Sequence, residues 1–220
     1  FNPTGASRTS TVDQDYNPIN HSVFTNNSRD RWYNYALNAE LRTQFDTTGR
    51  ELVVTADYAK YWNITKQAFS TTKYNNENLI TDQTFLTGDQ GGVLNLFAGK
   101  ADYTHPLKRD AKLEMGWKSS YVTSDNNVKF YNNLNDQLFF DTARSSHFLY
   151  SEIINAAYIN FNKTIKKVTM QFGLRGEQTI ADGKQMLNGQ TFHRNYPLIF
   201  PTAFIDYKIN EKHALNINMG

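Results

Sequence analysis

The chain of 220 residues has a formal net charge of +2, no cysteine and 14% aromatic residues. The length can bury the core of one or two domains, the near-neutral charge does not indicate a nucleic-acid partner, and the missing cysteines exclude disulfides and thiolate metal sites. The mean hydropathy is −0.63, and no stretch of the sequence approaches the run of about 20 apolar residues that a membrane-spanning helix needs, which excludes such a helix. The low mean hydropathy does not exclude a membrane β-barrel, because each barrel strand turns about half of its residues toward a polar interior.

The first predicted element is a long β-hairpin over residues 33–62 that turns at Asp46-Thr47-Thr48-Gly49. Apolar and polar residues alternate before and after this turn, as in a strand with one apolar and one wet face. Leu37 and Leu41 share the apolar face with Leu52 and Val54.

Three further hairpins follow in the chain, and the four together predict about eight antiparallel strands. Their strands cover 94–107 with 111–122, 148–161 with 168–179, and 198–209 with the residues from His213 onward. Alternation is clear in most of these strands. It is blurred in 148–161, where Ile154 and Tyr158 share a face with Glu152, and we assign that face inward.

The alternation assigns the strand residues to two faces. We expect these apolar residues to face outward: Leu37, Leu41, Leu52, Val54, Leu113, Met115, Met170, Phe172, Ile205 and Ile217. We expect these charged residues to face inward, toward a lumen, where they can pair across strands or contact a plug: Glu40, Arg42, Glu51, Asp57, Lys112, Glu114, Lys118, Arg175 and Glu177.

Short and long connections alternate along the chain. Tight turns are expected at 46–50, 106–110, 162–166 and 210–212, and long polar loops at 1–31, 63–92, 123–147 and 180–197. Outer-membrane barrels have this asymmetry, with short periplasmic turns and longer extracellular loops. Aromatic residues lie near both ends of the predicted strands, as expected for two membrane-interface girdles: Tyr33, Tyr35, Trp62, Tyr103, Trp117, Tyr121, Phe161 and Tyr207.

Three stretches resemble the β-barrel portion of bacterial TonB-dependent outer-membrane receptors of the Bacteroidetes type. They are AGKADYTHPLKRDAKLEMGWKSSYV, FLYSEIINAAYINFNKTIKKVTMQFGLRGEQT and YPLIFPTAFIDYKINEKHALNIN, and the resemblance extends from Trp32 over nearly the whole remaining chain. It implies a barrel of about 22 strands in the bacterial outer membrane that takes up a scarce nutrient such as a siderophore, an oligosaccharide or a peptide. It also implies as partners the outer-membrane lipid, a plug domain, the energy-coupling TonB protein and a surface lipoprotein.

We therefore expect an all-β, antiparallel, up-and-down segment of about eight strands from a larger transmembrane barrel, spanning residues 1–220 without a plug domain. Both ends of the chain are expected on the extracellular side. Three alternatives remain open: a passive outer-membrane channel, a complete eight-stranded structural barrel, and a soluble β-sandwich that binds carbohydrate.

No residue pattern predicts catalysis, a cofactor or a bound metal. The histidines are scattered at His21, His105, His147, His193 and His213, without the close spacing of a metal-ligand pair. Ser145-Ser146-His147 places a hydroxyl beside an imidazole in the sequence. Neighbouring residues of a strand face opposite sides, however, and a catalytic triad needs its side chains within reach of one another. We expect a protein that is not an enzyme.

Overall fold

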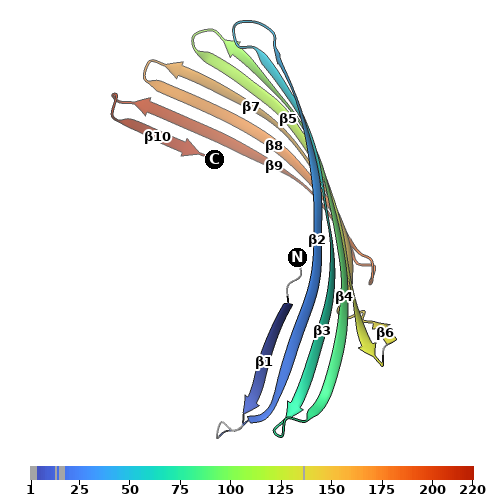
Figure 1. Ribbon diagram of the computed structural model, residues 1–220. Helices are drawn as coiled ribbons and strands as arrows, with labels where there is room; N and C mark the ends of the chain where they lie inside the picture. Colours follow the sequence, from blue (N-terminus) through green and yellow to red (C-terminus); the bar gives the residue numbers. More distant parts are fainter. Residues whose placement is uncertain (1–3, 13, 15–17, 136) are drawn as a thin grey trace.

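The computed structural model describes residues 4–12, 14, 18–135 and 137–220, and its regular structure is a single antiparallel sheet (Figure 1). The strands are β1 (Thr4–Val12), β2 (Pro18–Gln44), β3 (Glu51–Asn75), β4 (Ile80–Leu107), β5 (Ala111–Leu134), β6 (Gln137–Phe140), β7 (Ser146–Ile165), β8 (Val168–Gln185), β9 (Thr191–Lys208) and β10 (Ala214–Met219). Each strand pairs with the next along the chain, except that β6 folds back on β5 and β7 pairs with β5. The predicted up-and-down topology is confirmed.

The sheet is one curved layer that stays open between β1 and β10 (Figure 1). Within the described residues no second sheet packs against it, so the predicted alternative of a β-sandwich is wrong. The first and last strands do not pair with each other, so the described chain does not form a complete small barrel. The only buried apolar side chains among the described residues are three alanines, and no described helix could cross a membrane.

The strand register is continuous across the sheet and sorts the side chains into two faces. Directly paired residues of neighbouring strands point to the same side of a sheet. One row of such pairs runs from Leu41 to Val54, Ala101, Trp117 and Ala157. Following the pairs from β2 to β10 places all ten residues predicted to face outward on this apolar face. Glu40, Arg42, Glu114 and Arg175 lie on the opposite, charged face, as predicted.

Close packing at glycines identifies the charged face as the crowded inner side of the curve. Side chains on the inside of a bent sheet converge, whereas those on the outside diverge. A Cβ atom added to Gly92 or Gly116, on the charged face, would lie within 2.6 Å of a neighbouring side-chain oxygen. A Cβ added to Gly99 or Gly176, on the apolar face, would meet nothing within 4 Å. The apolar face is therefore the outer surface of the curved wall.

The turns 45–50, 108–110 and 166–167 lie at one end of the sheet, opposite the connections 76–79 and 186–190, as the hairpin order requires. The third tight turn is shorter than predicted, because β7 continues to Ile165 and Lys166 takes the left-handed backbone conformation with a φ of 54°.

The four ranges predicted as long polar loops are mostly strand. Residues 63–92 contain only a four-residue turn between β3 and β4, and the described part of 1–31 contains β1 and the first half of β2. Residues 123–134 continue β5, and 180–185 continue β8. These segments are rich in Thr, Asn, Ser and Gln on both faces, so they lack the apolar and polar alternation by which strands were recognised. Their extracellular location remains a prediction.

Candidate functional site

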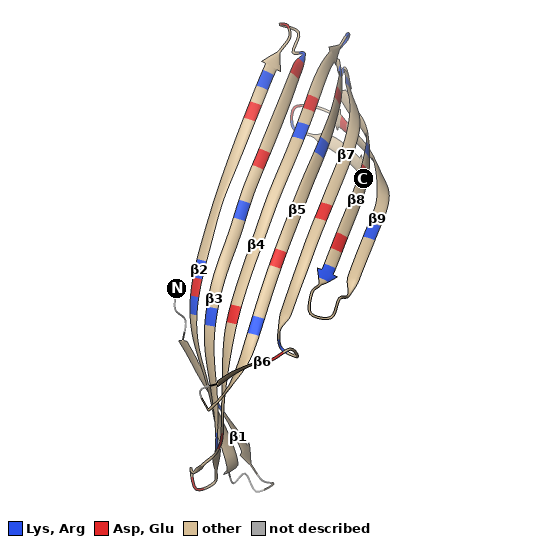
Figure 2. Ribbon diagram, turned by 90° about the vertical axis from the view of Figure 1, so that its right-hand side faces the viewer, with Lys and Arg blue, Asp and Glu red and all other residues tan. Residues whose placement is uncertain are grey.

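The charged face carries all nine residues that the sequence placed toward a lumen. On β2 these are Glu40 and Arg42, and on β3 they are Glu51 and Asp57. The register between the two strands places all four on the same face. Lys112, Glu114 and Lys118 lie on β5, and Arg175 and Glu177 lie on β8. Figure 2 shows the resulting bands of both charge signs across neighbouring strands. The register brings these residues onto one wall, and their exposure to a lumen remains a prediction.

Most of these charges are paired on the wall itself. The guanidinium of Arg42 forms an ion pair with Glu51 over 2.6 Å and lies 3.5 Å from the carboxylate of Glu40. Lys112 contacts Glu114 at 2.6 Å, and the guanidinium of Arg175 contacts Glu177 at 2.7 Å. Each of these side chains is at least one-fifth exposed, so each pair contributes at most about 1 kcal/mol to stability. The pairs keep the wall hydrated and near neutral rather than holding the sheet together.

Two charged residues of this wall were missed in the sequence, Lys100 and Asp102. Lys100 and Asp102 of β4 form an ion pair, and the Tyr158 hydroxyl donates to Asp102 over 2.5 Å. Gly116 of β5 lies between Asp102 and Tyr158 in the register and leaves the room for this bond. The signal was present, because Lys100 and Asp102 alternate with Ala101 and Tyr103 as the predicted charges do with their apolar neighbours. The inward assignment of Glu152, Ile154 and Tyr158 agrees with the register.

Lys118 differs from the other cations of the wall. It is paired in register with Lys100, and no described carboxylate lies within ion-pair distance of its ammonium group. Two lysines side by side leave a local excess of positive charge, which can attract an anionic group of a solute or of another domain. Among the described residues, no cluster of three or more histidines and carboxylates is arranged to hold a metal.

Aromatic residues border the apolar face. Toward the 76–79 end, Tyr33 stacks on Trp62 with ring centroids 5.2 Å apart, and Tyr58, Phe97 and Tyr121 follow in adjacent strands with centroid separations of 4.6 and 6.5 Å. Toward the tight turns, Phe45 lies 6.3 Å from Tyr103.

All eight predicted girdle residues lie on this apolar face. Tyr35 belongs with the first row, 5.9 Å from Trp62, and Phe161 and Tyr207 lie toward the tight turns. Trp117 does not lie at an edge. It shares the row of Val54 and Ala101, four residues along β5 from Tyr121. Nine residues, Leu113–Tyr121, therefore span the apolar band of β5, and a transmembrane β-strand needs about 9–11.

Two histidines lie on the outer face beyond the aromatic row. His147 contacts Asp125 at 2.9 Å, and His193 contacts Asp182 at 2.7 Å. Asp125, Asp182 and His193 line a shallow hollow of about 540 Å³ together with residues of β4, β7 and β8. Each imidazole has one carboxylate partner, so each histidine forms an ordinary surface pair rather than part of a catalytic group.

The chain was compared with known proteins. A family model described as "Outer membrane protein beta-barrel family" matches residues 43–220. A search among curated protein sequences found no match.

Three solved structures are among those similar to this chain. They are the ferric citrate transporter FecA (11% identity, TM-score 0.46), the ferric yersiniabactin uptake receptor FyuA from Yersinia pestis (11%, 0.46) and the copper transporter OprC (10%, 0.45). The matches cover 99%, 94% and 96% of this chain, respectively. They cover 41–42% of the chains of the three solved structures. This chain thus spans about two-fifths of the length of the solved chains it matches.

Proposed function

Because the chain belongs to the outer membrane protein beta-barrel family and lies in the bacterial outer membrane, we propose that it forms part of the barrel wall of a TonB-dependent receptor for active uptake of a scarce nutrient. The observation that supports the proposal best is the separation of the two faces over the band that the aromatic residues border at both ends. Among the described residues of this band, the outer face of β2 to β9 carries no charge, whereas the inner face of these strands carries the nine predicted charges. A wall with lipid on one side and water on the other needs this separation.

The charged face provides the contact surface for a plug domain. A receptor that opens by moving a plug needs a barrel wall that holds the plug without burying unpaired charge. The pairs Arg42–Glu51, Lys112–Glu114 and Arg175–Glu177 already satisfy one another, and they stay partly exposed. A polar plug surface can therefore exchange hydrogen bonds with them at small cost. Lys118, without a carboxylate partner, is the position where a plug carboxylate would bind most strongly.

The long ends of β2–β5 beyond the aromatic row form the extracellular part of the receptor. In this arrangement the tight turns face the periplasm, where the TonB protein engages the parent receptor, and the extensions face the medium, where the nutrient and a surface lipoprotein are met. Siderophore, metal, oligosaccharide and peptide uptake all fit a barrel of this kind. The remaining barrel strands, about 22 in total, close the wall.

Uptake in living cells tests the proposal. A strain lacking the gene and the same strain with the gene restored are grown with one limiting nutrient at a time, as ferric chelates, oligosaccharides and peptides. We expect one nutrient class to require the gene, and we expect an uncoupler that collapses the proton gradient to stop its entry while surface binding persists. Entry that continues with the uncoupler would contradict active uptake and support the passive-channel alternative.

A further inference from the structure

A hollow lined by three phenylalanines lies on the charged face, far beyond the aromatic row that borders the apolar band. Phe24 of β2, Phe69 of β3 and Phe130 of β5 line it together with Leu86, Asn132 and Arg144, and its volume is about 300 Å³. Phe69 is eleven residues along β3 from Tyr58. The hollow is therefore separate from the charged wall of the barrel interior described above.

The phenyl rings form an apolar floor. The ring centroids of Phe24 and Phe69 are 5.8 Å apart, with the ring planes inclined by 24°. Those of Phe69 and Phe130 are 6.3 Å apart, with the planes inclined by 40°. Phe130 leans over Gly88, where an added Cβ would lie 2.9 Å from the ring. The missing side chain at Gly88 thus brings the third ring toward the other two. Such a floor favours a flat apolar ring system, which can stack on it.

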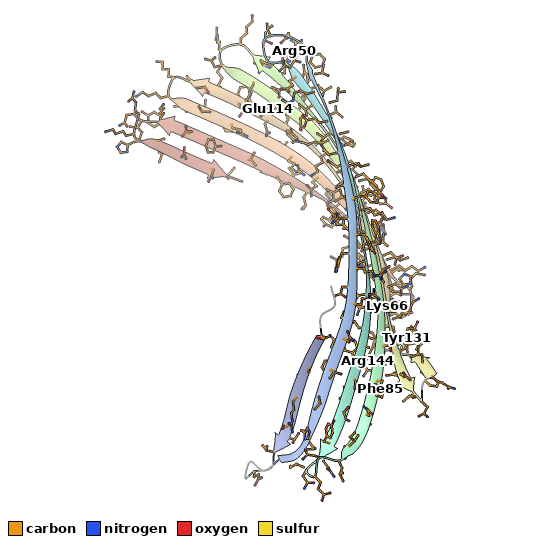
Figure 3. The ribbon with its side chains drawn as sticks, in the orientation of Figure 1. Arg50, Lys66, Phe85, Glu114, Tyr131 and Arg144 are labelled. Carbon is orange, nitrogen blue, oxygen red and sulfur yellow. The ribbon has the colours of Figure 1, made fainter. Side chains whose placement is uncertain are left out.

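The cationic side chain of Arg144 lies at the rim of this floor. It is held there by Asp141, in the corner that residues 141–145 form after β6. The carboxylate of Asp141 is 8% exposed and accepts hydrogen bonds from the Asn132 amide at 3.0 Å and from the backbone N–H groups of Ala143 and Arg144 at 3.0 and 3.1 Å. It also binds the guanidinium of Arg144, whose side chain remains 60% exposed. Figure 3 labels Arg144 beside the lower part of the sheet.

The arrangement leaves donors for a ligand. One guanidinium group has five N–H donors in a planar fork, and Asp141 occupies only part of them. Because the Asp141 carboxylate is satisfied by four donors, an anionic ligand meets the free side of Arg144 rather than an unpaired carboxylate. A charge-assisted hydrogen bond of this kind discriminates an anion from a neutral group of the same shape.

We propose that this hollow binds small molecules in which a flat apolar ring system carries an anionic group, with the ring on Phe24, Phe69 and Phe130 and the anion on Arg144. The inference rests on the proposed function, because in an uptake receptor this face lines the extracellular entrance. The proposed site limits the class of nutrient to aromatic anions and to larger compounds that contain an aromatic anion.

Calorimetry on the full-length protein in nanodiscs tests the proposal, with empty nanodiscs as the blank. The probes are 2-naphthoate and 2-naphthamide, which have the same ring and differ in charge. We expect naphthoate to bind about tenfold more tightly than naphthamide, as one charge-assisted hydrogen bond provides. Arg144→Gln should abolish the difference, and Phe69→Ala should weaken both probes. Arg29→Gln is the matched control, because Arg29 lies on the opposite face of β2.

Arg144→Lys separates recognition of the anion from folding of the corner. It keeps the positive charge, so we expect it to retain most of the preference for naphthoate. Equal affinity of the two probes for the wild type, or an unchanged preference in Arg144→Gln, would overturn the proposal. The binding assay requires no energised uptake. Normal uptake without a naphthoate preference would refute this site alone, and a naphthoate preference without energised uptake would refute the proposed function alone.

Discussion

A charge placed on the outer face at Val54 should destabilise the protein far more than the same charge placed one residue away. Val54 lies midway along the apolar band, four residues from Tyr58 and in the same row as Leu41, Ala101 and Trp117. Arginine at the middle of the lipid-facing side of a barrel costs about 2–4 kcal/mol. We therefore expect Val54→Arg to lower the ratio of folded to unfolded protein by about 30- to 900-fold.

The matched control is Val53→Arg. Val53 has the same residue type and strand but points to the charged face, where its register partners are Arg42 and Asp102. An arginine there is exposed to water and lies between the carboxylate of Asp102 and the guanidinium of Arg42. We therefore expect the free energy of unfolding to change by less than about 1 kcal/mol. Guanidinium titration of the full-length protein refolded in phosphatidylcholine vesicles, followed by tryptophan fluorescence, measures both variants. Equal losses, or a larger loss for Val53→Arg, would refute the assignment of the faces.

Three further results are expected. Gly116→Val should lower the free energy of unfolding by about 1–3 kcal/mol, because its Cβ would displace Tyr158 from Asp102, whereas Gly99→Val on the open face should be nearly neutral in the same titration. The hydrogen bond from Arg144, and then that from Asn132, holds the pKa of Asp141 below its ordinary value of 3.8, so this carboxylate stabilises the corner above that value and the effect is lost as the pH falls through the lowered pKa. Proteolysis between Phe140 and Ser146 should accordingly increase at acid pH in the wild type and be fast at neutral pH in Asp141→Asn; equal rates for the two proteins at neutral pH would contradict this role. In a chain without cysteine, Glu177→Cys should react with a water-soluble maleimide and Gly176→Cys should not, and faster labelling of Glu177→Cys after removal of the plug would support the plug contact.

The membrane-spanning part of the fold could be predicted from the sequence because alternation there is physically enforced. Lipid excludes charge from one face, so Leu113, Met115 and Trp117 alternate with Lys112, Glu114 and Gly116. Beyond the aromatic row polar residues occupy both faces, so the sequence shows no period of two there. The extensions of β2 to β5 are therefore strands without an apolar pattern, and they were expected to be loops. The sequence also did not predict the hollow lined by Phe24, Phe69, Phe130 and Arg144. Its residues come from four separate segments, and none of these segments has a residue pattern that indicates a binding site.

The unpaired edge of β2 supports the proposal that the open sheet is part of a closed barrel. β1 pairs with β2 only from Pro18 to Asn27, so on the β1 side the backbone N–H and C=O groups from Arg31 to Gln44 have no strand partner among the described residues. This edge includes Leu37 and Leu41, which are 67% and 65% exposed, and it therefore crosses the level of the apolar band. An unpaired backbone group in hydrocarbon costs several kcal/mol, so a membrane protein cannot leave such an edge uncovered. At the other edge, β10 presents Leu215, Ile217 and Met219 on the same face. Both edges thus carry the outer apolar pattern up to the last described strand, and a barrel wall that continues on each side satisfies them without any change of register.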